Sequence, residues 1–269
     1  MKIFCNSIDS DEFDAEEFEI QGTWLIGCKS DKKEIHVPDG VTEISYRALS
    51  DLKHTETVYL PDSVRLIDKD AFMYSSISKV YLPLNLEVIY REAFESSNIQ
   101  EIEIPPKVKE LMEAAFGHSY NLERVIMSDG VQSMSRLVFC WCKNLEYIRF
   151  SSNLLNIGPY AFSNCENLRR VEIPGNSLNV VREGAFKNCT SLTKISFPDS
   201  LEVIEWGAFQ GCSSLVEVSI PDNVTFKQGP GQTPIFKGCN KLELPPELEY
   251  LRIGIPKSQP SKYNTRNKK

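Results

Sequence analysis

Cysteine is the residue type that could support the most chemistry in this 269-residue chain, because a thiolate can bind a metal or form a disulfide. Five of the eight cysteines stand three positions after a phenylalanine: Cys142, Cys165, Cys189, Cys212 and Cys239. Metal ligands must converge on one point, whereas residues repeated in successive coils are spread by about 4.8 Å per coil. We therefore expect buried, reduced, metal-free thiols. Disulfides between neighbouring positions are the alternative, which the spacing does not require.

Catalytic motifs are not found among the remaining reactive residues. The chain has three histidines, and it contains no H-E-x-x-H motif, phosphate-binding loop or nucleophile elbow. Paired acids such as Glu101 and Glu103 would serve glycoside hydrolysis only at a defined separation around a cleft. Their alternate spacing instead predicts the solvated side of a strand. No catalytic residue, metal site or cofactor is expected, and an enzyme is the remote alternative.

A sequence repeat must position all of these residues. A unit of 22 to 24 residues recurs at least seven times, with the pattern V-x-I-P-x-x-V-x-x-I-x-x-x-A-F-x-x-C-x-x-L-x-x. Such a fixed period is typical of a solenoid. Alternating apolar residues predict a short strand, which the following proline ends, and a second apolar pair packs from the opposite wall. The Ala-Phe step closes each coil, so we expect Phe162 to stack between Phe139 and Phe186.

The pattern resembles the leucine-rich repeat of the BspA-like, or treponemal, type, which reads I-P-x-x-V-x-x-I-G-x-x-A-F-x-x-C-x-x-L. The resemblance runs from Ile35 to Leu251. Local departures are Leu49 in place of the Phe and Ser128 and Ser151 in place of the Pro. The resemblance implies a leucine-rich repeat solenoid of about nine repeats, an α/β-type right-handed horseshoe. It also implies a parallel sheet on the concave face, irregular or short helical segments on the convex face, and a role in protein binding or adhesion.

The two ends of the chain differ from the repeats. Residues 1–34 are predicted to be an acidic N-terminal cap with a β-hairpin, because a solenoid needs a polar cover over its first core layer. Residues 35–255 form the predicted solenoid with a truncated last coil. Residues 256–269 are predicted to be a basic, disordered tail. The repeats run without a linker, which favours one domain.

Charge and hydropathy exclude some partners and locations. The net charge of -7 disfavours nucleic-acid binding, which normally uses a basic face. No apolar run approaches the roughly 18 residues of a membrane span. The first residues lack the apolar stretch of a secretory signal, so we expect a cytoplasmic chain or one whose signal has been removed. The family resemblance implies the alternative, a secreted or cell-surface protein.

The outward positions of the concave strands hold the candidate binding residues. These positions are rich in aromatic and basic side chains, which are enriched among interface hot spots. The candidates are Tyr59, Lys79, Tyr81, Arg124, Ile126, Tyr147, Arg149 and Arg170. We expect a monomeric, non-enzymatic scaffold that binds an acidic protein partner. The alternatives are an adhesin that binds host protein or stacks carbohydrate on the tyrosines, and a strand face with no binding role.

Overall fold

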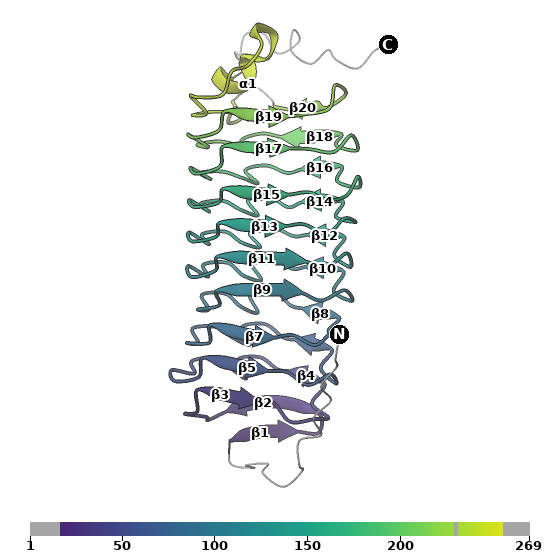
Figure 1. Ribbon diagram of the computed structural model, residues 1–269, viewed down its shortest axis with the longest axis vertical. Helices are drawn as coiled ribbons and strands as arrows, with labels where there is room; N and C mark the ends of the chain where they lie inside the picture. The colour runs from purple at the N-terminus through teal and green to yellow at the C-terminus, as the bar shows by residue number, and fades with distance from the viewer. Residues whose placement is uncertain (1–16, 229–230, 255–269) are drawn as a thin grey trace, which may run out of the picture.

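The computed structural model describes residues 17–228 and 231–254, which form one stack of coils along the long axis of the molecule (Figure 1). The predicted leucine-rich repeat solenoid is therefore confirmed. Most of the acidic N-terminal run and the whole predicted basic tail lie outside the described residues. The division of the chain at residues 34 and 255 stays a prediction.

One wall of the solenoid is a parallel ladder of strands, which we call the strand face. Its members are β3 (Glu34–His36), β5 (Thr57–Tyr59), β7 (Lys79–Tyr81), β9 (Glu101–Ile104), β11 (Arg124–Met127), β13 (Tyr147–Arg149), β15 (Arg170–Glu172), β17 (Lys194–Ser196) and β19 (Glu217–Ser219). Hydrogen bonds join them in three groups, β3 to β7, β9 to β15, and β17 with β19. In each group the apolar middle residues pair with one another, as Val125 pairs with Ile148, so the flanking residues face outward.

The opposite wall carries a second parallel ladder of very short strands. Its members are β4 (Glu43–Ile44), β6 (Leu66–Ile67), β8 (Val88–Ile89), β10 (Glu110–Leu111), β12 (Ser133–Met134), β14 (Asn156–Ile157), β16 (Val180–Val181), β18 (Val203–Glu205) and β20 (Thr225–Lys227). Irregular or short helical segments were expected on this wall. Between the proline turn and the Ala-Phe step each coil instead forms one short extended segment, as at Val88–Ile89 and Val203–Glu205. Helix in the described residues is confined to η1 (Pro246–Leu248) and α1 (Tyr250–Ile253).

The core is a continuous stack of phenylalanine rings. The ring of Phe162 lies parallel to those of Phe139 and Phe186, with centroids 5.3 Å away on both sides, as predicted. The backbone reinforces the stack, because the Phe162 amide donates a hydrogen bond to the Ala185 carbonyl of the next coil at 2.8 Å. Phe162 is fully buried. Each coil thus stacks on the next through both an aromatic ring and a main-chain hydrogen bond.

Separate elements cover the two ends of the stack. At the start, β1 (Phe18–Gln21) and β2 (Trp24–Cys28) form an antiparallel hairpin around Gly22, and β2 pairs in parallel with β4. At the other end, α1 takes the place of a further coil (Figure 1). The Phe236 amide donates to the Leu251 carbonyl at 2.8 Å, which continues the ladder of the phenylalanine stack into α1.

Candidate functional site

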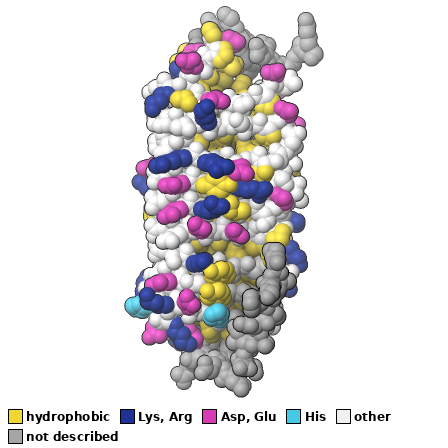
Figure 2. All heavy atoms as spheres, in the orientation of Figure 1, with side chains coloured by type: hydrophobic (Ala, Val, Ile, Leu, Met, Phe, Trp, Pro, Cys, Tyr) yellow, Lys and Arg dark blue, Asp and Glu magenta, His cyan; other side chains and the backbone are white. Residues whose placement is uncertain are grey.

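All eight predicted binding residues lie at outward positions of the strand face, and they form two groups. The first, which we call the aromatic strip, contains Tyr59, Tyr81, Lys79 and the adjacent His36, on β3 to β7. The second, which we call the arginine patch, contains Arg124, Ile126, Tyr147, Arg149 and Arg170, on β11 to β15. Glu101 and Glu103 on β9 separate the two groups. Figure 2 shows basic and acidic side chains interspersed along this side of the molecule.

The arginine patch is organised around one tyrosine ring. Parallel register places Arg124 and Arg170 on either side of Tyr147 in neighbouring strands. The Arg124 guanidinium carbon lies 5.0 Å from the centroid of the Tyr147 ring, and that of Arg170 lies 5.2 Å from it. A cation over an aromatic face is held by the ring quadrupole, and guanidinium groups also stack on the ring. The sequence predicted that these residues are neighbours, but it did not predict this stacked order.

Glu172 on β15 ties part of the arginine patch together. Its carboxylate lies 3.7 Å from Arg149 Nε and 3.3 Å from Arg170 Nη2, and it accepts a hydrogen bond from the Tyr147 hydroxyl at 2.8 Å. Burial and this hydrogen bond raise the pKa of Tyr147. The sequence left two roles open for Glu172, a partial offset of the charge of the patch and pairing with its arginines across coils. The parallel pairing of Arg149 with Glu172 was the available signal for the closer role.

Arg124 is the cation of the patch that remains available to a partner. It is exposed, and no carboxylate in the described part of the chain lies within 4.0 Å of its nitrogen atoms, although Glu101 is its register neighbour. Ile126, two residues along the same strand, is partly buried. Arg149 and Arg170 differ from Arg124, because Glu172 already neutralises part of their charge. The patch therefore presents one free guanidinium beside an apolar residue.

The rings of the aromatic strip stack on one another. The centroids of His36 and Tyr59 lie 4.3 Å apart with planes 3° from parallel, and those of Tyr59 and Tyr81 lie 4.5 Å apart at 5°. The Lys79 ammonium lies 4.8 Å from the Tyr81 centroid. Burial, and next the Glu34 carboxylate, raise the pKa of Tyr59. Both faces of the Tyr59 ring are therefore covered, and the strip presents ring edges and hydroxyl groups to solvent.

The five predicted cysteines form a buried column, as expected from the repeat. Each is buried, and each sulfur donates a hydrogen bond to the phenylalanine carbonyl of the preceding coil, at 3.1 Å for Cys165 to Phe139. Burial raises the pKa of the Cys142 and Cys165 thiols well above its ordinary value. In the described residues, no group of three or more His, Cys, Asp or Glu side chains is placed to hold a metal ion.

Comparison with known proteins agrees with this geometry. The model of the BspA type leucine rich repeat region, in six copies, matches residues 4–123 and 113–243. The chain belongs to this family. Proteins of the BspA type are repeat proteins and are generally non-enzymatic. No helix in the described part of this BspA-type chain combines the length and apolar character needed to cross a membrane.

Solved structures of other leucine-rich repeat proteins resemble this BspA-type chain. The T. pallidum leucine rich repeat protein TpLRR is 25% identical, with a TM-score of 0.60 over 88% of this chain and 92% of the other. A leucine rich cell surface protein of Faecalibacterium prausnitzii is 18% identical, with a TM-score of 0.43 over 86% and 90%. Among curated proteins, none has a sequence that matches this chain.

Proposed function

We propose that this chain is a non-enzymatic scaffold that holds a protein partner on its strand face, centred on the arginine patch. The observation that carries the proposal is the environment of Arg124. Its guanidinium is oriented by the Tyr147 ring, is exposed, and has no carboxylate within 4.0 Å in the described residues. An oriented, unpaired guanidinium is suited to a bidentate hydrogen bond with a carboxylate.

The charge pattern around Arg124 favours an acidic partner segment of limited size. Glu172 neutralises part of the charge of Arg149 and Arg170, and Glu101 and Glu103 lie on the adjacent strand. A broad acidic surface would meet these carboxylates, whereas a single acidic side chain could reach Arg124. Ile126 and the Tyr147 ring would supply the apolar contact around that ion pair.

Carbohydrate stacking on the strand-face tyrosines is the weaker alternative. A sugar ring needs an open aromatic face. The Tyr59 ring lies between those of His36 and Tyr81, and two guanidinium groups flank the Tyr147 ring. Members of this family are typically cell-surface proteins, and for that reason we favour a secreted or surface location over the cytoplasmic one.

The test is partner capture by the intact chain, followed by affinity measurements with purified captured partner. We expect Arg124→Glu to weaken binding by about tenfold or more, because it places a negative charge at the centre of the interface. Lys194→Glu is the matched control. It reverses an exposed cation of the same face that is already paired with Glu217 at 2.6 Å and lies outside the patch. Equal affinities for Arg124→Glu and wild type would refute the proposal.

A further inference from the structure

A second surface follows from the backbone at the turn behind each phenylalanine. The residue two positions after each phenylalanine of the stack, or after Leu49 in the first coil, has a positive φ. These residues are Asp51 (57°), Tyr74 (56°), Ser96 (54°), His118 (57°), Trp141 (62°), Asn164 (64°), Asn188 (59°), Gly211 (78°) and Gly238 (82°). Glycine and asparagine adopt this left-handed conformation readily, whereas a bulky aromatic residue does so at a cost. The positive φ belongs to the repeat, since a second series of residues, two positions before the phenylalanine, also has it, as at Leu137 (61°) and Tyr160 (53°). The aromatic side chains are what distinguish the turns of Tyr74, His118 and Trp141 from the others.

Two tyrosine rings at these turns are open, unlike the rings of the strand face and unlike Trp141, whose ring centroid lies 5.3 Å from the Lys143 ammonium. Tyr74 is 54% exposed, Tyr120 is 49% exposed and Trp141 is 38% exposed. Tyr120 meets the neighbouring His118 ring only edge-on, with centroids 6.0 Å apart, and the parallel His118 and Trp141 rings are offset at 6.3 Å. Within the described residues, no ring or cation packs on Tyr74. Two tyrosines thus offer ring faces to a ligand.

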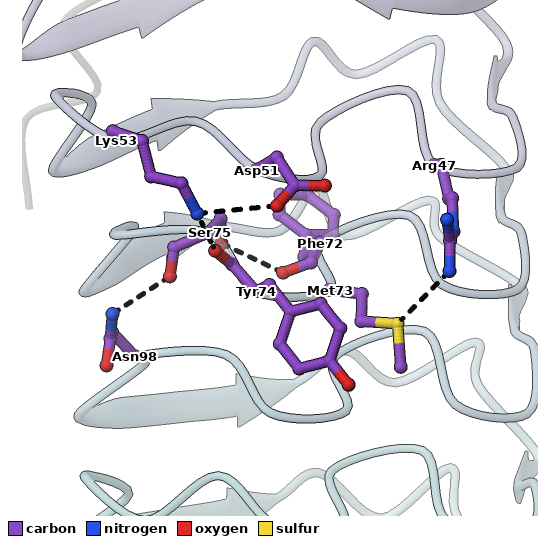
Figure 3. Close-up of polar contacts among 8 residues, drawn as sticks. All are labelled: Arg47, Asp51, Lys53, Phe72, Met73, Tyr74, Ser75 and Asn98. Atoms are coloured by element: carbon purple, nitrogen blue, oxygen red, sulfur yellow. Dashed lines mark hydrogen bonds and ion pairs between the residues drawn. The ribbon is translucent and has the colours of Figure 1, made fainter.

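Polar groups fill the space between the aromatic residues. Asn98 lies in the coil between Tyr74 and Tyr120; its amide donates to the Ser75 carbonyl at 2.9 Å, and its Oδ1 accepts from Asn121 Nδ2 at 2.9 Å. Figure 3 shows the Tyr74 turn, where the Lys53 ammonium reaches both the Asp51 carboxylate and the Tyr74 carbonyl.

The charges beside these aromatic residues are largely paired with one another. Lys53 lies 3.3 Å from the Asp51 carboxylate, and Lys143 lies 3.0 Å from the carboxylate of Glu166. The net electrostatic attraction for a charged ligand is therefore small at this surface. The surface instead offers aromatic faces, hydroxyl groups and amides, which is the combination that binds a ligand with both apolar faces and many hydroxyl groups.

We propose that this turn edge binds a neutral oligosaccharide. We define the turn edge as Tyr74, Asn98, His118, Tyr120, Asn121 and Trp141. Sugar rings lie against the open faces of Tyr74 and Tyr120, and the intervening hydroxyl groups bond to the amides of Asn98 and Asn121. The site is separate from the arginine patch, so either proposal can fail without the other.

Titration calorimetry of the intact chain with malto-, cello-, xylo- and N-acetylchito-oligosaccharides tests the proposal. We expect saturable binding of at least one probe, weakened about tenfold by Tyr74→Asn and by Tyr120→Ala. Asparagine suits the left-handed backbone at position 74, so this variant removes the ring without straining the turn. Tyr46→Ala is the control, since Tyr46 is 53% exposed but lies outside the turn edge.

Three results would overturn this assignment. One is that no probe of the four series binds saturably. Another is that Tyr74→Asn and Tyr120→Ala bind as tightly as wild type, or no more weakly than Tyr46→Ala. The third is that the two turn-edge variants weaken capture of a protein partner while no oligosaccharide binds, which would assign the turn edge to a protein.

Discussion

The two halves of this solenoid differ in the buried residue that stands three positions after the phenylalanine. In later coils a cysteine follows the phenylalanine by three positions, and Cys142 Sγ donates to the Phe116 carbonyl at 3.1 Å. In three earlier coils a serine stands there, and Ser119 Oγ donates to the Phe94 carbonyl at 2.8 Å. Ser75 instead donates to the Phe72 carbonyl of its own coil, and the first coil has the buried Leu52 at this position. The position therefore holds a buried residue that in most coils donates to a carbonyl, and it does not require thiol chemistry.

The coils also differ at the left-handed turn, although this division falls one coil later, since Trp141 belongs to the coil of Cys142. The last four coils place Asn164, Asn188, Gly211 and Gly238 there, residue types that fit the backbone. Earlier coils place Tyr74, His118 and Trp141 at the same position, at a conformational cost. This contrast separates the structural role of the repeat from the roles of its surfaces.

The largest expected effect is alkaline destabilisation of the cysteine half. Burial raises the pKa of Cys140 to about 11 and holds those of Cys142, Cys165 and Cys212 well above the ordinary value. The folded thiols then keep protons that the unfolded chain loses, so stability is full below about pH 9 and falls as pH rises. Each thiol contributes about 1.4 kcal/mol per pH unit. Urea melts should therefore show a free energy of unfolding that falls by several kcal/mol between pH 8 and pH 10.

The serine half supplies the control for that prediction. Cys165→Ser installs the hydroxyl of the earlier coils and removes one titrating thiol, so the loss between pH 9 and pH 10 should shrink by about 1 kcal/mol. Thiol reagents should react slowly with the folded chain and rapidly in denaturant. A free energy of unfolding that does not change up to pH 10 would contradict the claim that these thiols are buried and protonated in the folded chain.

Truncation of the phenylalanine stack should be the next largest effect, and it should be alike in both halves. We expect Phe162→Ala to lower the free energy of unfolding by roughly 3–5 kcal/mol, because a fully buried ring leaves a cavity. Phe94→Ala in the serine half should fall in the same range. A thermal or urea melt that shows a loss below about 1 kcal/mol would place the ring outside a shared core.

The hydrogen bond from the residue three positions after the phenylalanine can be tested by exchanging serine and cysteine at that position. Ser119→Ala removes the donor to the buried Phe94 carbonyl and should cost about 1–3 kcal/mol. Ser119→Cys restores the donor found in later coils and should cost less than half as much. Equal losses in urea melts for the two variants would mean that side-chain volume, and not the hydrogen bond, defines this position.

The smallest effects concern the left-handed turn. Trp141→Asn should raise the free energy of unfolding by up to about 1 kcal/mol, because asparagine tolerates this backbone. Gly238→Ala should lower it by about 1 kcal/mol, although no atom lies closer than 3.5 Å to the added methyl group. Opposite signs in the same melts support the contrast between the halves, and a loss for Trp141→Asn would reveal a structural role for the ring.

The repeat predicted the strand face of this structure better than the second ladder and the left-handed turns. Alternation of apolar residues gave the register of the strand face, since Glu101, Arg124, Tyr147 and Arg170 do follow one another across four strands. It did not give the second ladder, because most strands of that ladder have only two residues and so cannot show an alternation. The left-handed turns were hidden, since the early coils place Tyr, Ser, His and Trp where glycine would have marked them.

Side-chain geometry was the least predictable level of the candidate site. The sequence offered Arg124, Arg149 and Arg170 as equal candidates, whereas side-chain direction decides which cation is free. Glu172 holds Arg149 and Arg170, and only Arg124 of the three arginines is left without a carboxylate nearby in the described residues. Such choices depend on rotamers and on pairing between strands, which the order of residues does not specify.

Binding of the purified partner to the double variant Tyr147→Ala, Arg149→Glu is the decisive experiment for the arginine patch. The variant removes the ring that orients Arg124 and adds an acid beside Glu172. We expect a loss of roughly 2 kcal/mol or more in binding free energy, with little change in melting temperature, because both side chains lie on the surface ladder. Unchanged affinity in a folded variant would contradict it and would move the site to the aromatic strip.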